Sequence, residues 1–284
     1  MFSDILMTVD FDRTFTAPDA TIPRRNLEAV AFFMENGGCF TINTGRSVSS
    51  FGRHLGNVPA NGPILMYNGS ARWTDGVLSD IKLLDLDLWE TAATVQREFP
   101  DLNLEIQGVD YHYLINPKPE FTAFYDALKW GYRIAQPGDD LGPFLKFAVA
   151  GSPRSNSVAT LFDTTEEEMA RFDAVQARIV ELWGDKIEVY RAAPRIIDVH
   201  AKGVSKIAAA RQLQQELGKK ILVCVGDAEN DVPMLDGADY AFCPADSVVA
   251  GRYETVCNCG DGAIADVINK KIPEILGIAL DIQG

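Results

Sequence analysis

The sequence predicts an α/β fold: a parallel sheet with a second α/β segment inserted into it. Three short apolar runs flanked by helix-like segments are typical of strands buried in such a sheet; they are Ile5–Val9, Cys39–Ile42 and Ile221–Val225. A crossover between parallel strands needs only a dozen or more residues, whereas residues 43–220 separate the second run from the third. The excess predicts an inserted domain.

Length and composition agree with two modules. The 284 residues exceed a typical domain of about 100–200, and the 47% hydrophobic content is ample for a sizeable core. We expect residues 1–83 and 201–284 to form the sheet-containing core. Residues 84–200 are then the inserted α/β domain.

The elements of the core follow in order. After the first strand, Thr21 is a candidate N-cap with Pro23 in the first helical turn, and Gly37-Gly38 ends the helix before the second strand. Asn68-Gly69, between two strand-like runs, predicts a type I′ hairpin. Beyond the insertion we expect a helix at 204–217, the third strand, a short strand at 239–243 and a closing helix near 263–275.

The sequence of the inserted segment predicts a mixture of helices and strands. We expect helices at 86–99, near 120–130 and from 164 onward, and strands at Phe144–Ala150, 187–191 and 195–200.

Polar residues follow each of the three apolar runs. Asp10, Thr44 and Asp227 stand just past their carboxyl ends. Ligands of open α/β sheets bind outside the carboxyl ends of the strands. We therefore expect these three residues to converge on one site.

The acidic residues of that site indicate a metal ion. Asp10 and Asp12 lie two apart, and Asp227 is followed by Asn230 and Asp231. Either group alone is more typical of turns and helix caps. Together they change the interpretation, because like charges about 4 Å apart repel by roughly 4 kcal/mol at an effective dielectric of 20. A cation is required, and oxygen ligands suit Mg²⁺.

Thr44, Gly45 and Lys206 supply the complementary half. A hydroxyl, backbone N–H groups at a helix start and an ammonium are the usual cradle for phosphoryl oxygens. Alone, Thr44 would be an N-cap and Lys206 a surface lysine. With the carboxylates they predict a site that moves a phosphoryl group.

Charge and cysteine content exclude other classes. The formal charge of −14 argues against nucleic acid or an anionic membrane as partner. We see neither a signal peptide nor a membrane span, so a cytoplasmic protein is expected. The five cysteines lack the ligand spacing of a zinc site and indicate buried reduced thiols.

The four segments resemble the motifs of the haloacid dehalogenase superfamily in order and chain position. They are Asp-x-Asp-x-Thr from Asp10, Thr-Gly-Arg from Thr44, the lysine of Lys-Gly-Val-Ser-Lys, and Gly-Asp-x-x-Asn-Asp-x-x-Met-Leu from Gly226. The insertion resembles the α/β (type IIB) cap of the Cof-type subfamily, and Asn68-Gly69 also fits its pattern. The resemblance implies a Rossmann-like core with an inserted cap.

The resemblance also implies roles for individual residues. Asp10 would be the nucleophile and Asp12 the general acid/base. Mg²⁺ would be held by Asp10, Asp227 and the backbone carbonyl of Asp12. The phosphate-binding residues would be Thr44, Gly45, Lys206 and Asn230, with Asp231 and Arg46 in support.

The implied activity is Mg²⁺-dependent hydrolysis of small phosphate monoesters, sugar or polyol phosphates first, through an aspartyl-phosphate. A phosphosugar mutase with the same core is the alternative, because the motifs do not separate the two. A non-catalytic phosphate sensor would have no need of both Asp10 and Asp12.

One position departs from the family. Glycine is usual where this chain has Arg13, and glycine is favoured where φ is positive or the backbone is approached closely. Arginine there either strains the turn or places a guanidinium near the cap. Further candidates for substrate contact are Tyr111, Tyr113 and Arg195.

Overall fold

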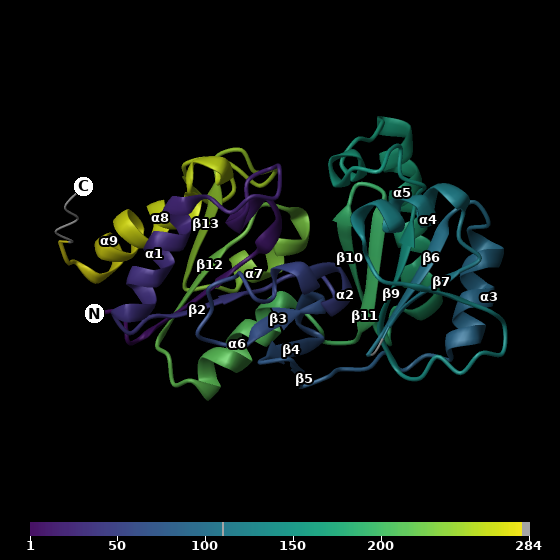
Figure 1. The fold of residues 1–284 in the computed structure, drawn as a ribbon, viewed down its shortest axis with the longest axis horizontal. Coiled ribbons are helices and arrows are strands. Elements are labelled where there is room, and N and C mark those ends of the chain that lie inside the picture. The colour runs from purple at the N-terminus through teal and green to yellow at the C-terminus, as the bar shows by residue number, and fades with distance from the viewer. Residues whose placement is uncertain (110, 280–284) are drawn as a thin grey trace. The chain divides into compact units, whose positions relative to one another are not determined.

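The computed structural model describes residues 1–109 and 111–279, and the chain forms two compact units (Figure 1). The core unit comprises Met1–Thr44, Gly56–Ser79 and Ser205–Gly284, and the inserted unit comprises Gly45–Leu55 and Asp80–Val204. No helix in the described part of the chain combines the length and the apolar character needed to cross a membrane.

The core unit contains a five-stranded parallel sheet. Its strand order is β14-β13-β12-β1-β2. Val9, the last residue of β1, pairs with Ile42 on one side and Val225 on the other, so three loops leave the sheet at one level. The strands are β1 Ile5–Val9, β2 Cys39–Ile42, β12 Ile221–Val225, β13 Tyr240–Pro244 and β14 Glu254–Val256. The predicted parallel sheet and α/β class are confirmed.

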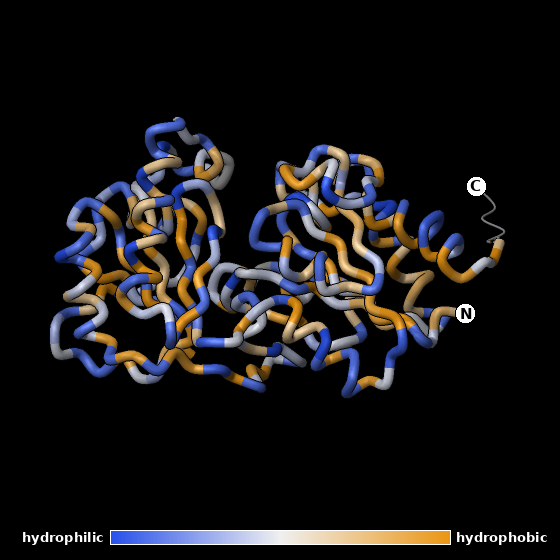
Figure 2. The backbone as a smooth tube through the Cα atoms, turned by 180° about the vertical axis from the view of Figure 1, so that it is seen from behind, coloured by the Kyte–Doolittle hydropathy of each residue, from blue (hydrophilic) through white to orange (hydrophobic). Residues whose placement is uncertain are grey.

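Helices cover both faces of this sheet. Ala209, Ala210 and Leu213 of α6 (Lys206–Glu216) and Met234 of α7 (Val232–Asp236) pack against β1 and β12 in one apolar cluster. On the other side lie α1 (Arg24–Glu35) and α8 (Ala263–Asp266), which contact each other (Figure 1). The last segments are the π-helical turn η7 (Val267–Lys271) and α9 (Ile272–Leu276). Figure 2 shows the central strands at the hydrophobic end of the scale, as burial on both faces requires.

The start of α1 differs from the prediction. The helix begins at Arg24 with Pro23 at the N-cap position, so Thr21 is not its cap. The reason is local: the Thr21 hydroxyl donates to Asp19 Oδ1 at 2.6 Å, which holds it in a turn ahead of the helix.

The Asn68-Gly69 turn is confirmed, with one difference of length. Strand β3 (Ile64–Met66) pairs with β4 (Ala71–Thr74), and β4 pairs antiparallel with β5 (Val77–Ser79). Four residues connect β3 and β4. Asn68 and Gly69 have φ of 54° and 94°, and Ser70 N–H donates to Tyr67 O at 3.1 Å. Positive φ at both central positions is the type I′ geometry.

The inserted unit contains a six-stranded sheet in the order β10-β11-β9-β6-β7-β8, antiparallel except for the β7–β8 pair. Side chains of α3 and α5 cover one face in a large apolar cluster. The other face carries a row of buried polar residues, in which Lys146 pairs with Gln107 and His200 on its neighbours. The strands are β6 Asn103–Gly108, β7 His112–Ile115, β8 Arg133–Ala135, β9 Phe144–Ala150, β10 Ile187–Ala193 and β11 Ile196–Ala201; the helices are α2 Val48–Phe51, α3 Leu88–Glu98, α4 Pro119–Leu128 and α5 Glu166–Trp183.

Candidate active site

A buried lysine joins two carboxylates at the carboxyl ends of the core strands. Lys206 Nζ donates to Asp10 Oδ1 at 2.5 Å and to Asp231 Oδ1 at 2.6 Å. Lys206 is 2% exposed and Asp231 is fully buried. Charged side chains are tolerated in a protein interior when they are paired, and breaking such a pair is costly. We therefore expect these three side chains to keep their arrangement in the folded protein.

The position of Lys206 is set by the start of α6. Ser205 is the N-cap and accepts from Ala208 N–H at 3.1 Å. Asn43, fully buried at the end of β2, donates from Nδ2 to Lys206 O at 2.9 Å. Sequence reasoning missed Asn43, and its signal was its place directly after a buried strand and before Thr44.

The turn at Gly69 packs against the same helix start. A Cβ on Gly69 would lie 2.6 Å from Ser205 O and 2.8 Å from Ala209 Cβ. Glycine is therefore required there for close approach as well as for its positive φ.

Asp231 also shapes the loop that follows β12. Its Oδ2 accepts from the N–H groups of Asp227 at 3.0 Å and Ala228 at 3.1 Å. A Cβ on Gly226 would lie 2.6 Å from Asp231 Cβ. The absence of a side chain at Gly226 thus leaves room for Asp231 to pack over the loop. The hydrogen bond from Asp227 N–H to Asp231 then holds Asp227 at the site.

Three carboxylates meet at this point. Within residues 1–109 and 111–279, the group spaced to hold a metal ion is Asp10, Asp227 and Asp231, whose oxygens lie within 4.8 Å of one another. The oxygens of Asp231 are already bonded to Lys206 and to backbone N–H groups. Asp10 and Asp227 are therefore the side chains best placed to hold a cation, and an all-oxygen donor set fits Mg²⁺.

Thr14 fixes one of these carboxylates. Its hydroxyl donates to Asp227 Oδ1 at 3.0 Å, and both residues are buried. Thr14 was not among the predicted site residues, although its place in Asp-x-Asp-x-Thr was the available signal.

Burial and the neighbouring carboxylates disfavour the ionised forms of Asp10 and Asp227. Burial raises the pKa of Asp10 to about 7 against the opposing effect of Lys206, and the charges of Asp231 and Asp12 add to the rise. Burial and then Asp10 raise the pKa of Asp227 well above its usual value. Burial lowers the pKa of Lys206, but Asp10 and Asp231 outweigh it and raise that pKa above the ordinary lysine value. A divalent cation beside Asp10 and Asp227 would favour their ionised forms.

Arg13 adopts a conformation that explains why glycine is usual at this position. Its φ of 59° and ψ of 11° are left-handed, which costs about 1–2 kcal/mol for a residue with a Cβ. Arg13 N–H donates to Thr16 Oγ1 at 3.2 Å, and its Nε lies 4.0 Å from Asp227 Oδ2. Asp12 precedes it in the same turn and is half-buried.

The phosphate-holding candidates are divided between the units. Thr44 is buried, its N–H donating to Leu65 O and its carbonyl accepting from Asn68 N–H, both at 2.9 Å. Asn230 lies half-buried in the short turn that also contains Asp231.

Gly45 and Arg46 belong to the inserted unit. The carbonyl of Gly45 accepts from Lys146 Nζ at 3.2 Å, and Arg46 Nη1 donates to Ser50 O at 3.0 Å. These contacts anchor the segment after Thr44 to the inserted unit.

The candidates for substrate contact differ in their surroundings. Tyr113 is buried in the apolar cluster beneath α3 and α5. Arg195 is buried and donates to two backbone carbonyls, at 3.0 Å and 3.2 Å. Tyr111 is 45% exposed, and the Arg133 guanidinium lies 3.4 Å from its ring centre. Tyr111 lines a cavity.

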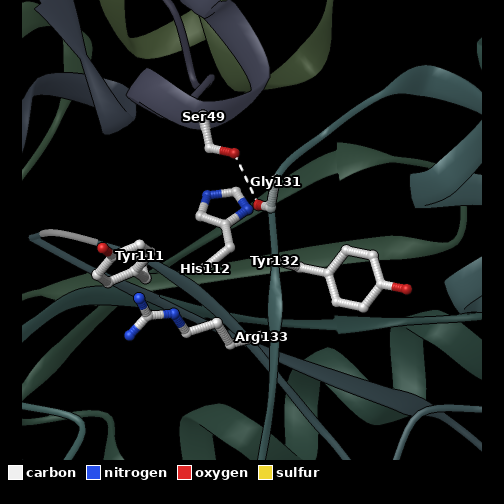
Figure 3. Close-up of a pocket in the computed structure, with 6 residues that line it drawn as sticks. All are labelled: Ser49, Tyr111, His112, Gly131, Tyr132 and Arg133. Atoms are coloured by element: carbon white, nitrogen blue, oxygen red, sulfur yellow. Dashed lines mark hydrogen bonds between the residues drawn. The ribbon is translucent and has the colours of Figure 1, made fainter.

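That cavity lies within the inserted unit and has a volume of about 300 Å³. Figure 3 shows the His112 ring between Ser49 and the Tyr111–Arg133 pair, with Ser49 Oγ donating to Gly131 O at 2.8 Å. His112 is buried, and its Nδ1 lies 3.2 Å from Glu105 Oε1. The lining residues are Ser49, Tyr111, His112, Gly131, Tyr132 and Arg133.

Comparison with known families gives a match over most of the chain. A model of the haloacid dehalogenase-like hydrolases matches residues 7–248, which include all four sequence motifs.

Solved structures share this fold. SMU.1108c from Streptococcus mutans superposes with a TM-score of 0.77 at 16% identity, covering 94% of this chain and 98% of that one. BT1666 from Bacteroides thetaiotaomicron, described among phosphatases, gives 0.72 at 17% identity, covering 96% and 94%. BT4131, described as a subclass IIB sugar phosphatase, gives 0.71 at 16% identity, covering 96% and 98%. At these identities the likeness concerns the fold.

Proposed function

The chain belongs to the haloacid dehalogenase-like hydrolases, and on that premise we propose that it is a Mg²⁺-dependent phosphatase of small phosphate monoesters. The observation that carries the proposal is the buried lysine at the strand ends. Lys206 bonds Asp10 and Asp231 at 2.5 Å and 2.6 Å in the same cluster as Asp227. A candidate nucleophilic carboxylate, a buried ammonium and a second carboxylate in one cluster support phosphoryl transfer.

The first half of the reaction forms a covalent intermediate on Asp10. A carboxylate oxygen of Asp10 attacks phosphorus, the new P–O bond forms, and the bond to the ester oxygen breaks. Asp12 gives its proton to the departing oxygen, so that the alcohol leaves neutral. The product of this half-reaction is an acyl phosphate on Asp10 and an ionised Asp12.

The second half hydrolyses that intermediate. Asp12 takes a proton from water, whose oxygen attacks phosphorus, and the bond to Asp10 breaks. Inorganic phosphate leaves, with Asp10 ionised and Asp12 protonated as at the start. Because the same residue gives and then takes the proton, the cycle needs no further co-reactant.

Lys206 and Thr44 stabilise the group in transfer. The Lys206 ammonium neutralises charge on the phosphoryl oxygens and holds the Asp10 carboxylate in line, while Thr44 presents its hydroxyl from the end of β2. Mg²⁺, held by Asp10, Asp227 and the Asp12 carbonyl, would supply the rest of the charge neutralisation. Thr14 and Asp231 keep Asp227 in position for that role.

Sugar or polyol phosphates are the substrate class that we propose. A protein of the same fold is described as a sugar phosphatase, and the motifs resemble the Cof-type subfamily with its large cap. A large inserted unit in the same chain as a small catalytic cluster suits a substrate whose leaving group is polar and several carbons long.

A panel of phosphate esters, assayed with Mg²⁺ for release of inorganic phosphate, tests the proposal. The parent should hydrolyse at least one ester and Asp10→Asn none. Asp4→Asn, in an exposed pair with Lys220 in the same unit, is the matched control and should keep the parent rate. An isomerised ester without phosphate release would indicate a mutase, and ester binding without turnover would indicate a sensor.

A further inference from the structure

Arg13 brings a second cation to the carboxylate cluster. Its Nε lies 4.0 Å from Asp227 Oδ2, while Thr14 occupies the other oxygen of the same carboxylate. The Arg13 side chain is 39% exposed, whereas that of Asp227 is 9% exposed. A partly exposed positive charge thus lies close to a nearly buried negative one.

The two cations of the site make direct contacts with different carboxylates. Lys206 makes hydrogen bonds to Asp10 and Asp231. Arg13 faces Asp227, which is the carboxylate that we propose as a metal ligand beside Asp10. Arg13 has a left-handed backbone, and its Nε lies 4.0 Å from Asp227 Oδ2.

We propose that Arg13 holds a positive charge beside Asp227 and thereby lowers the affinity of the site for Mg²⁺. The inference rests on the metal site of the proposed function. A cation that takes Asp227 as a ligand withdraws the negative charge that Arg13 faces, and the two positive charges repel. A group that stabilises only the metal-free state weakens metal binding by the same free energy.

The consequence is that metal loading follows the free Mg²⁺ concentration over a higher range. With a glycine or an uncharged side chain at this position, the site would stay loaded at lower Mg²⁺. Because Arg13 is partly exposed, salt screens its effect. The difference between the parent and an uncharged variant should therefore shrink as ionic strength rises.

Isothermal titration of the metal-stripped full chain with Mg²⁺ tests the inference without an activity assay. Arg13→Met removes the charge but keeps a Cβ at the strained φ, and should tighten Mg²⁺ binding by about fivefold or more at low salt. Arg13→Lys keeps the charge and should bind Mg²⁺ as the parent does. Arg13→Gly removes both the charge and the strain, and should tighten binding at least as much as Arg13→Met.

Arg252→Met is the matched control, because Arg252 pairs with the exposed Glu229 at 3.1 Å in the same unit. It should leave the Mg²⁺ affinity unchanged. Parent-like or weaker binding by both Arg13→Met and Arg13→Gly, with melting curves showing both folded, would overturn the role of Arg13. If the parent itself bound no Mg²⁺, or Asp227→Asn bound it equally well, the proposed metal site would fail and this inference with it.

Discussion

Replacing Lys206 by methionine should lower kcat/KM by about three orders of magnitude, whereas the same change at Lys202 should have little effect. At an effective dielectric of 20, a charge pair at the 2.5 Å of Lys206 and Asp10 attracts by about 6–7 kcal/mol. Desolvation of the buried groups offsets part of this, and losing one preorganised group that stabilises charge in an active site costs about 2.7–4 kcal/mol in the transition state. A loss of about 4 kcal/mol in the transition state is about a thousandfold in rate.

Lys202 is the matched control for Lys206, because it is a lysine nearby in the sequence and in an exposed ion pair. Its side chain is 58% exposed and pairs with Glu188 at 3.1 Å, a kind of contact that contributes at most about 1 kcal/mol. Both variants should be assayed for kcat/KM on one ester with Mg²⁺, and for folding by circular dichroism and urea unfolding. A Lys206→Met enzyme within tenfold of the parent, or a larger loss from Lys202→Met, would refute the assignment of Lys206.

Three other outcomes are expected. Chelation should abolish hydrolysis and Mg²⁺ should restore it, whereas Ca²⁺, with its longer bonds, should bind and inhibit; full activity in excess chelator would remove the metal from the account. Burial lowers the pKa of His112 and of His200, so below about pH 6.5 the unfolded chain binds protons first. As the pH falls below this value, the free energy of unfolding should decrease by up to about 1.4 kcal/mol per pH unit for each histidine. Urea unfolding midpoints measured at several pH values test this, and the same dependence on pH in the His112→Asn/His200→Asn double variant would contradict it. Gly69→Ala should destabilise by about 2 kcal/mol more than Gly76→Ala in urea unfolding, because both glycines have positive φ but only a Cβ on Gly69 meets Ser205 O; equal losses would show that the contact with α6 is unimportant.

The central strands and one turn of the fold could be predicted from the sequence, because short stretches of neighbouring residues determine them. Largely apolar runs such as Ile5–Val9 indicate buried parallel strands, and the structure pairs these runs in one parallel sheet. The Asn68-Gly69 turn could also be predicted, since few residue types other than asparagine and glycine adopt the positive φ angles that it needs. The helix start at Arg24 could not be predicted, because the Thr21 side chain bonds to Asp19 and does not cap the helix.

Features that depend on distant contacts were missed. Glu105 and Gln107 alternate with apolar residues in β6, which suggests a strand with one solvent-facing side, yet both are buried in the polar row of the inserted sheet. Asn43 and Thr14 act through partners 163 and 213 positions away. No pattern within either segment indicates which partner each will meet.

The most direct test of the account is chemical trapping of the intermediate. The enzyme is quenched in acid during turnover of an active ester and reduced with borohydride, which converts an aspartyl phosphate to homoserine, and the modified residue is located by peptide mass spectrometry. We predict homoserine at position 10, absent when the ester is omitted. Modification at another residue, or none under conditions where the alcohol is released in a burst before phosphate, would contradict the assignment of Asp10 as the nucleophile.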